Sequence, residues 1–168
     1  LVLFFKAKKK DLEVIPGISR TVIDSFLYDG VKDRAKLAYE AWQREGARVF
    51  FIADQDYPFR LSWCNDAPVV LFGKGKCDLN VPRLVSVVGM RQVSQEGREL
   101  CEELINDLQG CDVTVVSGLA YGVDILAHRA CHKRGIPTVA CLAHGLDRIY
   151  PNVHQREARQ MLEEGGLL

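Results

Sequence analysis

Three short apolar runs constrain the fold of this chain more than any other feature. They are rich in β-branched residues, lack polar alternation, and occupy residues 84–88, 113–116 and 138–142. Such runs are typical of strands that are covered on both faces in a parallel sheet. Parallel strands need crossover connections, and the segments between these runs are long enough to hold helices. The alternation of strand and helix therefore predicts an α/β fold.

Two of the connecting segments carry clear helix signals. Residues 94–109 place apolar side chains at helical spacing among acidic ones, and Ser94 is a suitable N-cap. Residues 124–134 form a second apolar stripe, with Asp124 as the expected N-cap and Gly135 as the C-terminal stop. Right-handed crossovers then predict a Rossmann-like, doubly wound, mostly parallel sheet with helices on both faces. Ligands of such sheets bind beyond the carboxyl ends of the strands.

The first part of the chain has a different pattern of predicted secondary structure. Helices are predicted at residues 20–27 and 33–45, and an apolar run at 48–52 indicates a strand. We therefore expect a small helical module over residues 1–46 and a Rossmann-like domain over residues 47–168. The final Gly-Gly-Leu-Leu is typical of the start of another strand, so the domain is expected to be incomplete at its C-terminus.

Composition narrows the functional classes. The 168 residues include 22 Lys+Arg and 22 Asp+Glu, so any phosphate must be held by a local patch rather than by the net charge. The six cysteines lack paired metal-ligand spacing, which predicts reduced thiols and no metal or other cofactor. The apolar opening precedes lysines, the reverse of a signal peptide, and is too short to span a membrane. The chain is therefore expected to be cytoplasmic, without a membrane partner.

The segments after the predicted strands are rich in residues that suit phosphate binding. Glycines let backbone amides approach an anion, helix N-termini favour negative charge, and arginines supply planar cations. Because the carboxyl ends of parallel strands share one edge of the sheet, these segments are expected to form one phosphate or nucleotide site. The candidate residues are Gly89, Arg91, Ser94, Gly97, Ser117, Gly118, Ala120, Gly122, Asp124, His128, Gly145, Asp147 and Arg156.

A structural interpretation of the same residues stays open. The glycines can serve strand-to-helix packing, and Asp124 and His128 can form an i, i+4 pair on one helical face. His128 and His132 have metal-ligand spacing, but no glutamate stands in the H-E-x-x-H position, so no metal is predicted. Ser117 is not a nucleophile elbow, because G-x-S-x-G fails at Val115. No catalytic residues are predicted.

Several strings resemble the DNA-processing protein A (DprA/Smf) family in their order and spacing. They are Val-Val-Gly-Met-Arg from residue 87, Ser-Gly-Leu-Ala-Tyr-Gly-Val-Asp from 117, and Gly-Leu-Asp-Arg-Ile-Tyr-Pro from 145. The resemblance extends from about residue 57 to residue 168. It implies a SAM or helix-hairpin-helix-like lead-in followed by an extended Rossmann fold. It also implies a homodimer that binds single-stranded DNA, protects incoming DNA in natural transformation, and helps to load the RecA recombinase, without being an enzyme.

The resemblance also assigns residues. The family's G-S/T-R-x-x-S loop falls on Gly89, Arg91 and Ser94, and its S-G-x-A-x-G-x-D loop falls on residues 117–124. A basic residue after the family's Tyr-Pro corresponds to Arg156. Two positions depart from the pattern, and they carry Met90 in place of a small hydroxyl residue and His154 in place of an asparagine.

Two other functional hypotheses are considered. One is a Rossmann-like hydrolase that acts on nucleoside monophosphates, although the P-G-G-x-G-T-x-x-E string of such enzymes is absent from this sequence. The other is a scaffold that contacts only proteins. Oligonucleotide binding without base release would favour the DNA-binding hypothesis over both.

Overall fold

The computed structural model describes residues 8–28, 30–76 and 78–168. It divides the chain into two compact units, Leu1–Glu45 and Gly46–Leu168. The first unit contains α1 (Lys9–Glu13), α2 (Arg20–Leu27) and α3 (Gly30–Arg44). Helix α2 begins where the Ser19 hydroxyl accepts a hydrogen bond from the Val22 amide, at 3.4 Å.

The second unit is built on a mixed sheet. Across the described residues the sheet has six strands in the order β1-β2-β6-β5-β4-β3. Strands β3 to β6 are parallel, whereas β2 is antiparallel to both β1 and β6. This arrangement confirms the predicted α/β class and the mostly parallel sheet. The strands are β1 (Arg48–Phe51), β2 (Val70–Gly75), β3 (Leu84–Ser86), β4 (Thr114–Ser117), β5 (Thr138–Ala140) and β6 (Gly166–Leu167).

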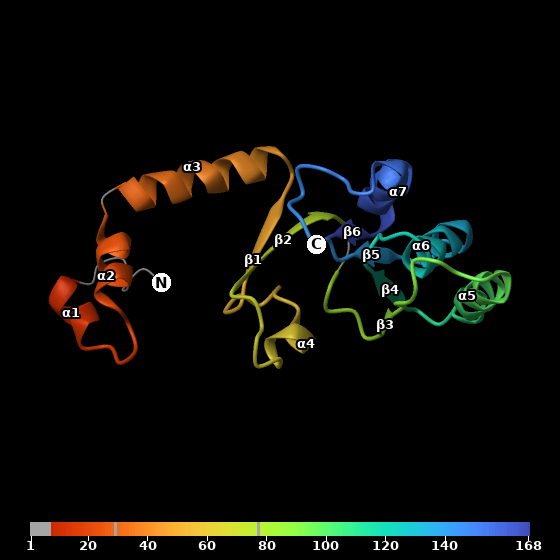
Figure 1. The fold of residues 1–168 in the computed structure, drawn as a ribbon, viewed down its shortest axis with the longest axis horizontal. Coiled ribbons are helices and arrows are strands. Elements are labelled where there is room, and N and C mark those ends of the chain that lie inside the picture. Colours follow the sequence, from red (N-terminus) through yellow and green to blue (C-terminus); the bar gives the residue numbers. More distant parts are fainter. Residues whose placement is uncertain (1–7, 29, 77) are drawn as a thin grey trace. The chain divides into compact units, whose positions relative to one another are not determined.

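The crossover helices lie on one face of this sheet (Figure 1). They are α5 (Gln95–Asp107), α6 (Val123–Arg134) and α7 (Gln155–Glu164). Val115 and Ala140 pack with these helices, whereas Val116 and Val139, on the opposite face, pack with residues of the 50–79 segment. That segment includes the short α4 (Phe59–Ser62).

The sequence predicted helices on both faces of the sheet, whereas the structure has the crossover helices on one face only. Strands β3 to β6 lie side by side in sequence order, and right-handed crossovers that always advance in one direction leave their helices on the same side. The other face is therefore covered by β-hairpin residues and α4, with Tyr57 and Leu79 buried there. None of the described helices is long and apolar enough to cross a membrane.

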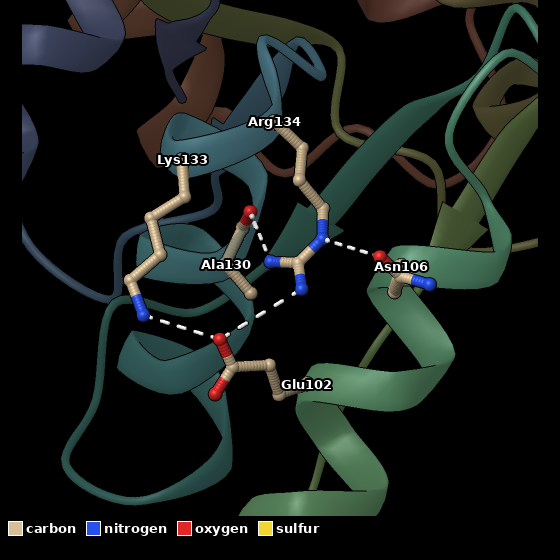
Figure 2. Close-up of polar contacts among 5 residues, drawn as sticks. All are labelled: Glu102, Asn106, Ala130, Lys133 and Arg134. Carbon is tan, nitrogen blue, oxygen red and sulfur yellow. Dashed lines mark hydrogen bonds and ion pairs between the residues drawn. The ribbon is translucent and has the colours of Figure 1, made fainter.

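A polar network joins the C-terminal part of α6 to α5 (Figure 2). The Arg134 guanidinium donates to the Asn106 side-chain oxygen at 3.3 Å and to the Ala130 carbonyl at 3.2 Å. Glu102 accepts from Lys133 at 3.1 Å and lies 3.7 Å from Arg134. The hydrogen bond from Lys133 is the main reason that the pKa of Glu102 is below its usual value. The network fixes the pairing of α5 with α6, which both contribute to the core.

Replacing Arg134 by methionine is expected to lower the free energy of unfolding by about 1 kcal/mol. Methionine keeps an apolar stem against α5 but removes the hydrogen bonds to Asn106 and Ala130. Urea unfolding measures the change. Lys133→Met is the control and is expected to cost less, because the Lys133 side chain is 66% exposed. Equal losses in the two variants would contradict the importance given to the half-buried Arg134 side chain.

Candidate nucleic-acid interface

At Gly122 the loop after β4 packs closely against the loop after β3. Gly122 has a φ of 85° and is the N-cap of α6, the role that the sequence assigned to Asp124. A Cβ at this position would overlap the Met90 carbonyl oxygen and lie 2.6 Å from the Arg91 Cα. The next amide, of Val123, donates to the Met90 carbonyl at 3.2 Å. The backbone of Arg91 is thus held directly against Gly122.

Asp124 stabilises the second loop, which follows β4, through hydrogen bonds to its backbone. Its carboxylate is buried and accepts hydrogen bonds from the amides of Gly118 at 3.2 Å and Ala120 at 3.3 Å. The prediction that Asp124 is an N-cap was wrong, because the N-cap of α6 lies two residues earlier, at Gly122, where the two loops touch. In this conformation the amides of Gly118 and Ala120 are also occupied, so they are not available to a phosphate.

His128 lies beneath the interface rather than in it. Its side chain is fully buried, and its Nδ1 lies 2.7 Å from the Thr138 hydroxyl. That hydroxyl donates its hydrogen to the Val115 carbonyl, so it must accept one from Nδ1 of a neutral imidazole. Burial, with the nearby His132 and His154, lowers the pKa of His128 to about 3. The prediction of a phosphate contact by His128 is therefore corrected to a structural role.

Ser117 is also buried, and its hydroxyl donates to the Val87 carbonyl at 2.6 Å. Ser117, Asp124 and His128 thus each bond to a different group instead of to one another. Gly89 and Gly97 fit the packing interpretation, because a Cβ at either would lie within 3.0 Å of a valine side chain. Sequence alone could not separate these internal roles from ligand contacts.

The loop between β3 and α5 keeps its hydrogen-bond donors free. Within the described part of the chain, no backbone amide from Val88 to Ser94 donates a hydrogen bond, and Arg91 is exposed without a partner. The Ser94 hydroxyl caps α5 by accepting from the Gly97 amide at 3.2 Å, as predicted. Glu96 accepts hydrogen bonds from its own amide and from Ser94, and these lower the pKa of its carboxyl. The backbone amides that remain free to bind an anion therefore lie mainly in residues 88–94, before the start of α5.

His154 attaches the third loop, which follows β5, to the second loop, which follows β4. The short helix η2 (Asn152–His154) buries the imidazole, whose Nδ1 donates to the Leu119 carbonyl at 2.8 Å. The ring also packs edge-on against Tyr121, with ring centroids 5.2 Å apart. In the sequence, His154 stands out only as a departure from the family pattern, and this structural role was not predicted. Two residues later, Arg156 is exposed and has no partner among the described residues.

The backbones that carry Arg91 and Arg156 therefore flank the dipeptide Tyr121–Gly122. Arg91 contacts Gly122, and the residue two positions before Arg156 contacts Tyr121. Gly145 and Asp147 lie farther along the third loop, where a Cβ on Gly145 would be 2.7 Å from the Asp147 carboxylate. Asp147 is exposed. The structure thus brings the three loops together and keeps both predicted arginines accessible.

Large apolar side chains are exposed on the same three loops. The three loops expose five of them, and we call this set the loop platform. Residues 87–94, 117–122 and 141–156 together hold three arginines and one aspartate, so these segments themselves carry net positive charge. Among the described residues, no cluster of His, Cys, Asp or Glu could hold a metal ion. The loop platform consists of Val88, Met90, Tyr121, Tyr150 and Val153.

Comparison with known proteins identifies the family. The family model described as DNA recombination-mediator protein A matches residues 48–168. The chain belongs to this family. This match confirms the family resemblance that the loop strings indicated. The matched range includes all three loops described above.

Individual relatives support the same assignment. DNA processing protein DprA of Streptococcus pneumoniae is 43% identical over 107 residues, which cover 64% of this chain and 38% of that protein. DNA processing protein DprA of Bacillus subtilis is 32% identical over 129 residues, which cover 76% of this chain and 43% of that protein. The chain therefore spans less than half of each of these curated relatives.

Solved structures of family members share the fold. The X-ray structure of DprA from Streptococcus pneumoniae has a TM-score of 0.76 and 31% identity, covering 95% of this chain and 54% of that one. DNA processing protein A from Helicobacter pylori, solved in a study of its single-stranded DNA binding mode, has a TM-score of 0.61 and 23% identity. That match covers 72% of this chain and 54% of the other, and at this identity it shows the fold alone.

Proposed function

We propose that this chain binds single-stranded DNA and forms part of a recombination mediator that protects incoming DNA in natural transformation. One observation carries the proposal: two exposed arginines without partners in the described structure flank a platform of exposed aromatic and apolar side chains. A basic surface interleaved with stacking groups suits a flexible strand whose phosphates and base faces are both accessible. Membership of a recombination-mediator family supports the same ligand.

The binding mode follows from the residues. Arg91 and Arg156 contact phosphates, assisted by the free amides of residues 88–94. Tyr121 is 48% exposed and is braced by His154, so its ring offers a fixed surface for a base. Tyr150 offers a second ring. Duplex DNA hides its base faces in the stack, so the same surface is expected to prefer single strands.

The double variant Arg91→Gln/Arg156→Gln tests this mode. Its affinity for labelled oligo-dT is expected to fall about tenfold, and by the same factor for oligonucleotides of unrelated sequence, because phosphate contacts carry no sequence information. The slope of log affinity against log salt is expected to become shallower by about 1.4, since each phosphate contact on a single strand contributes about 0.7. Fluorescence anisotropy at several salt concentrations measures both quantities.

Lys133→Gln is the control for this experiment, because Lys133 lies in the last turn of α6, near the amino end of β5, away from the loop platform. It should bind as the unmodified chain does. If the folded double variant keeps its affinity and salt slope, or if Lys133→Gln loses as much, the assigned loops do not form the binding surface.

The proposal assigns binding without catalysis. Ser117, Asp124 and His128 are each engaged in a separate internal hydrogen bond, which leaves none of them placed as a nucleophile and its base. Incubation with nucleoside monophosphates discriminates this proposal from the hydrolase hypothesis. Unchanged nucleotides are expected, and release of free base would overturn the assignment.

Family membership also supports three finer parts of the proposal, namely loading of a RecA recombinase, homodimer formation and a cytoplasmic location. The recombinase and dimer interactions are tested together by size-exclusion chromatography of the protein with oligo-dT, with and without RecA. Elution as a dimer, and co-elution with RecA on the strand, are the expected results. Elution as a monomer, or separate elution of RecA, would contradict the corresponding part.

A further inference from the structure

A groove of ≈ 200 Å³ lies at the same edge of the sheet as the loop platform. We call it the α7 groove. Its walls are the loop segment Leu146–Ile149, one side of α7, and the ends of two strands. Lys74 of β2 pairs in register with Leu167 of β6, and both line the groove. The α7 groove therefore lies beyond β5, whereas the loop platform begins at β3.

Cations and apolar side chains share the lining. Lys74, Arg148 and Arg159 face a single carboxylate, that of Asp147, so the groove carries net positive charge. Arg148 and Arg159 are exposed and have no partner in the described part of the chain. The Lys74 ammonium donates to the Leu146 carbonyl at 3.4 Å, which holds it at the wall. The apolar part of the lining is Leu146, Ile149, Ala158, Leu162 and Leu167.

This combination fits one chemical class of ligand. Guanidinium groups bind phosphate, and an apolar surface accepts the face of a base, so a nucleotide unit matches both parts of the lining. Another cavity, of ≈ 310 Å³, lies near the amino ends of β4 and β5 and does not fit as well. Its arginine, Arg134, is already bonded to Asn106 and Ala130 and paired with Glu102.

We propose that the α7 groove binds a further nucleotide of the same single strand that contacts the loop platform. The inference rests on the proposed function and extends it to the path of the strand. Arg156 and Arg159 are three residues apart on α7, so they are neighbours on the helix surface and connect the two regions. The strand then runs along the carboxyl edge of the sheet from β3 to β6. Three inter-strand spacings make this path roughly 15 Å long, so it requires more than one nucleotide.

Dependence on oligonucleotide length tests the path. The unmodified chain, Arg159→Gln and the double variant Arg148→Gln/Arg159→Gln are titrated with labelled oligo-dT of about 4 and about 16 nucleotides. A short strand can satisfy the loop platform alone, whereas a long strand also reaches the groove. Arg159→Gln is expected to lose about threefold in affinity for the long strand, and the double variant about tenfold, while both keep the affinity for the short strand. Lys133→Gln is the charge-matched control for Arg159→Gln and should retain both affinities.

The outcomes separate this inference from the proposed function. If the unmodified chain binds neither strand, the proposed function fails, and the inference fails with it. If it binds both strands but the groove variants bind the long strand normally, the inference alone fails. Equal losses for both lengths would also overturn it, because the groove would then belong to the primary contact. A long strand that lacks bases at one end should lose affinity as the groove variants do; full affinity would refute the base contact.

Discussion

Replacing Gly122 by alanine is expected to lower the free energy of unfolding by about 3 kcal/mol and to remove most single-strand binding. About 1 kcal/mol follows from the backbone conformation, since φ is 85° and ψ is −131°, a region that residues with a side chain rarely adopt. About 2 kcal/mol follows from overlap with the Met90 carbonyl and the Arg91 Cα, which are backbone atoms and cannot rotate away. The loop that carries Arg91 must therefore move away from Tyr121. Urea unfolding and oligo-dT anisotropy measure the two effects.

Gly135→Ala is the matched control for this variant. Gly135 also has a positive φ, 65°, but a Cβ there would meet no atom within 4 Å. It is expected to cost about 1 kcal/mol and to leave binding unchanged, because it lies at the far end of α6. If Gly122→Ala costs no more than Gly135→Ala and binds oligo-dT normally, the contact between the two loops does not organise the interface.

The contrast between these glycines shows what sequence patterns can predict. Gly135 follows an apolar stripe and basic residues, which is a local signal, and it ends α6 in the left-handed region as expected. The three parallel strands and the Ser94 cap are local signals as well. Gly122 owes its importance to the Met90 carbonyl, which is distant in sequence. No local pattern identifies such a contact.

The predicted roles of Asp124 and His128 were wrong, and the reason is again that their contacts are not local in sequence. Aspartate and histidine bind ligands and also satisfy buried backbone or hydroxyl groups, so residue type alone leaves both roles open. The single apolar stripe read from the sequence suggested that α6 buries one face. The helix instead packs against both α5 and α7, which buries additional positions. His128 occupies one of them, and the sequence could not supply that burial because it depends on the placement of three helices.

The buried imidazole makes stability depend on pH. Burial lowers the pKa of His128 from 6.5 to about 3, so the folded chain keeps it neutral where the unfolded chain binds a proton. The unfolded state is therefore favoured as the pH falls from 6.5 towards 3, and stability rises with pH across this window. Between pH 7.5 and pH 5, His128 is expected to reduce the free energy of unfolding by about 2 kcal/mol. Urea unfolding at the two pH values measures this loss.

His128→Asn separates this effect from other titrations. An asparagine amide can still donate to the Thr138 hydroxyl, as Nδ1 does, but it does not titrate. The variant is expected to be less stable at pH 7.5, because a smaller side chain leaves a cavity. It should nevertheless lose about 2 kcal/mol less than the unmodified chain on going to pH 5. His132, whose pKa burial also lowers, is present in both proteins, so its own titration is common to both. An identical pH dependence in the two proteins would show that the His128 imidazole accepts a proton in the folded chain.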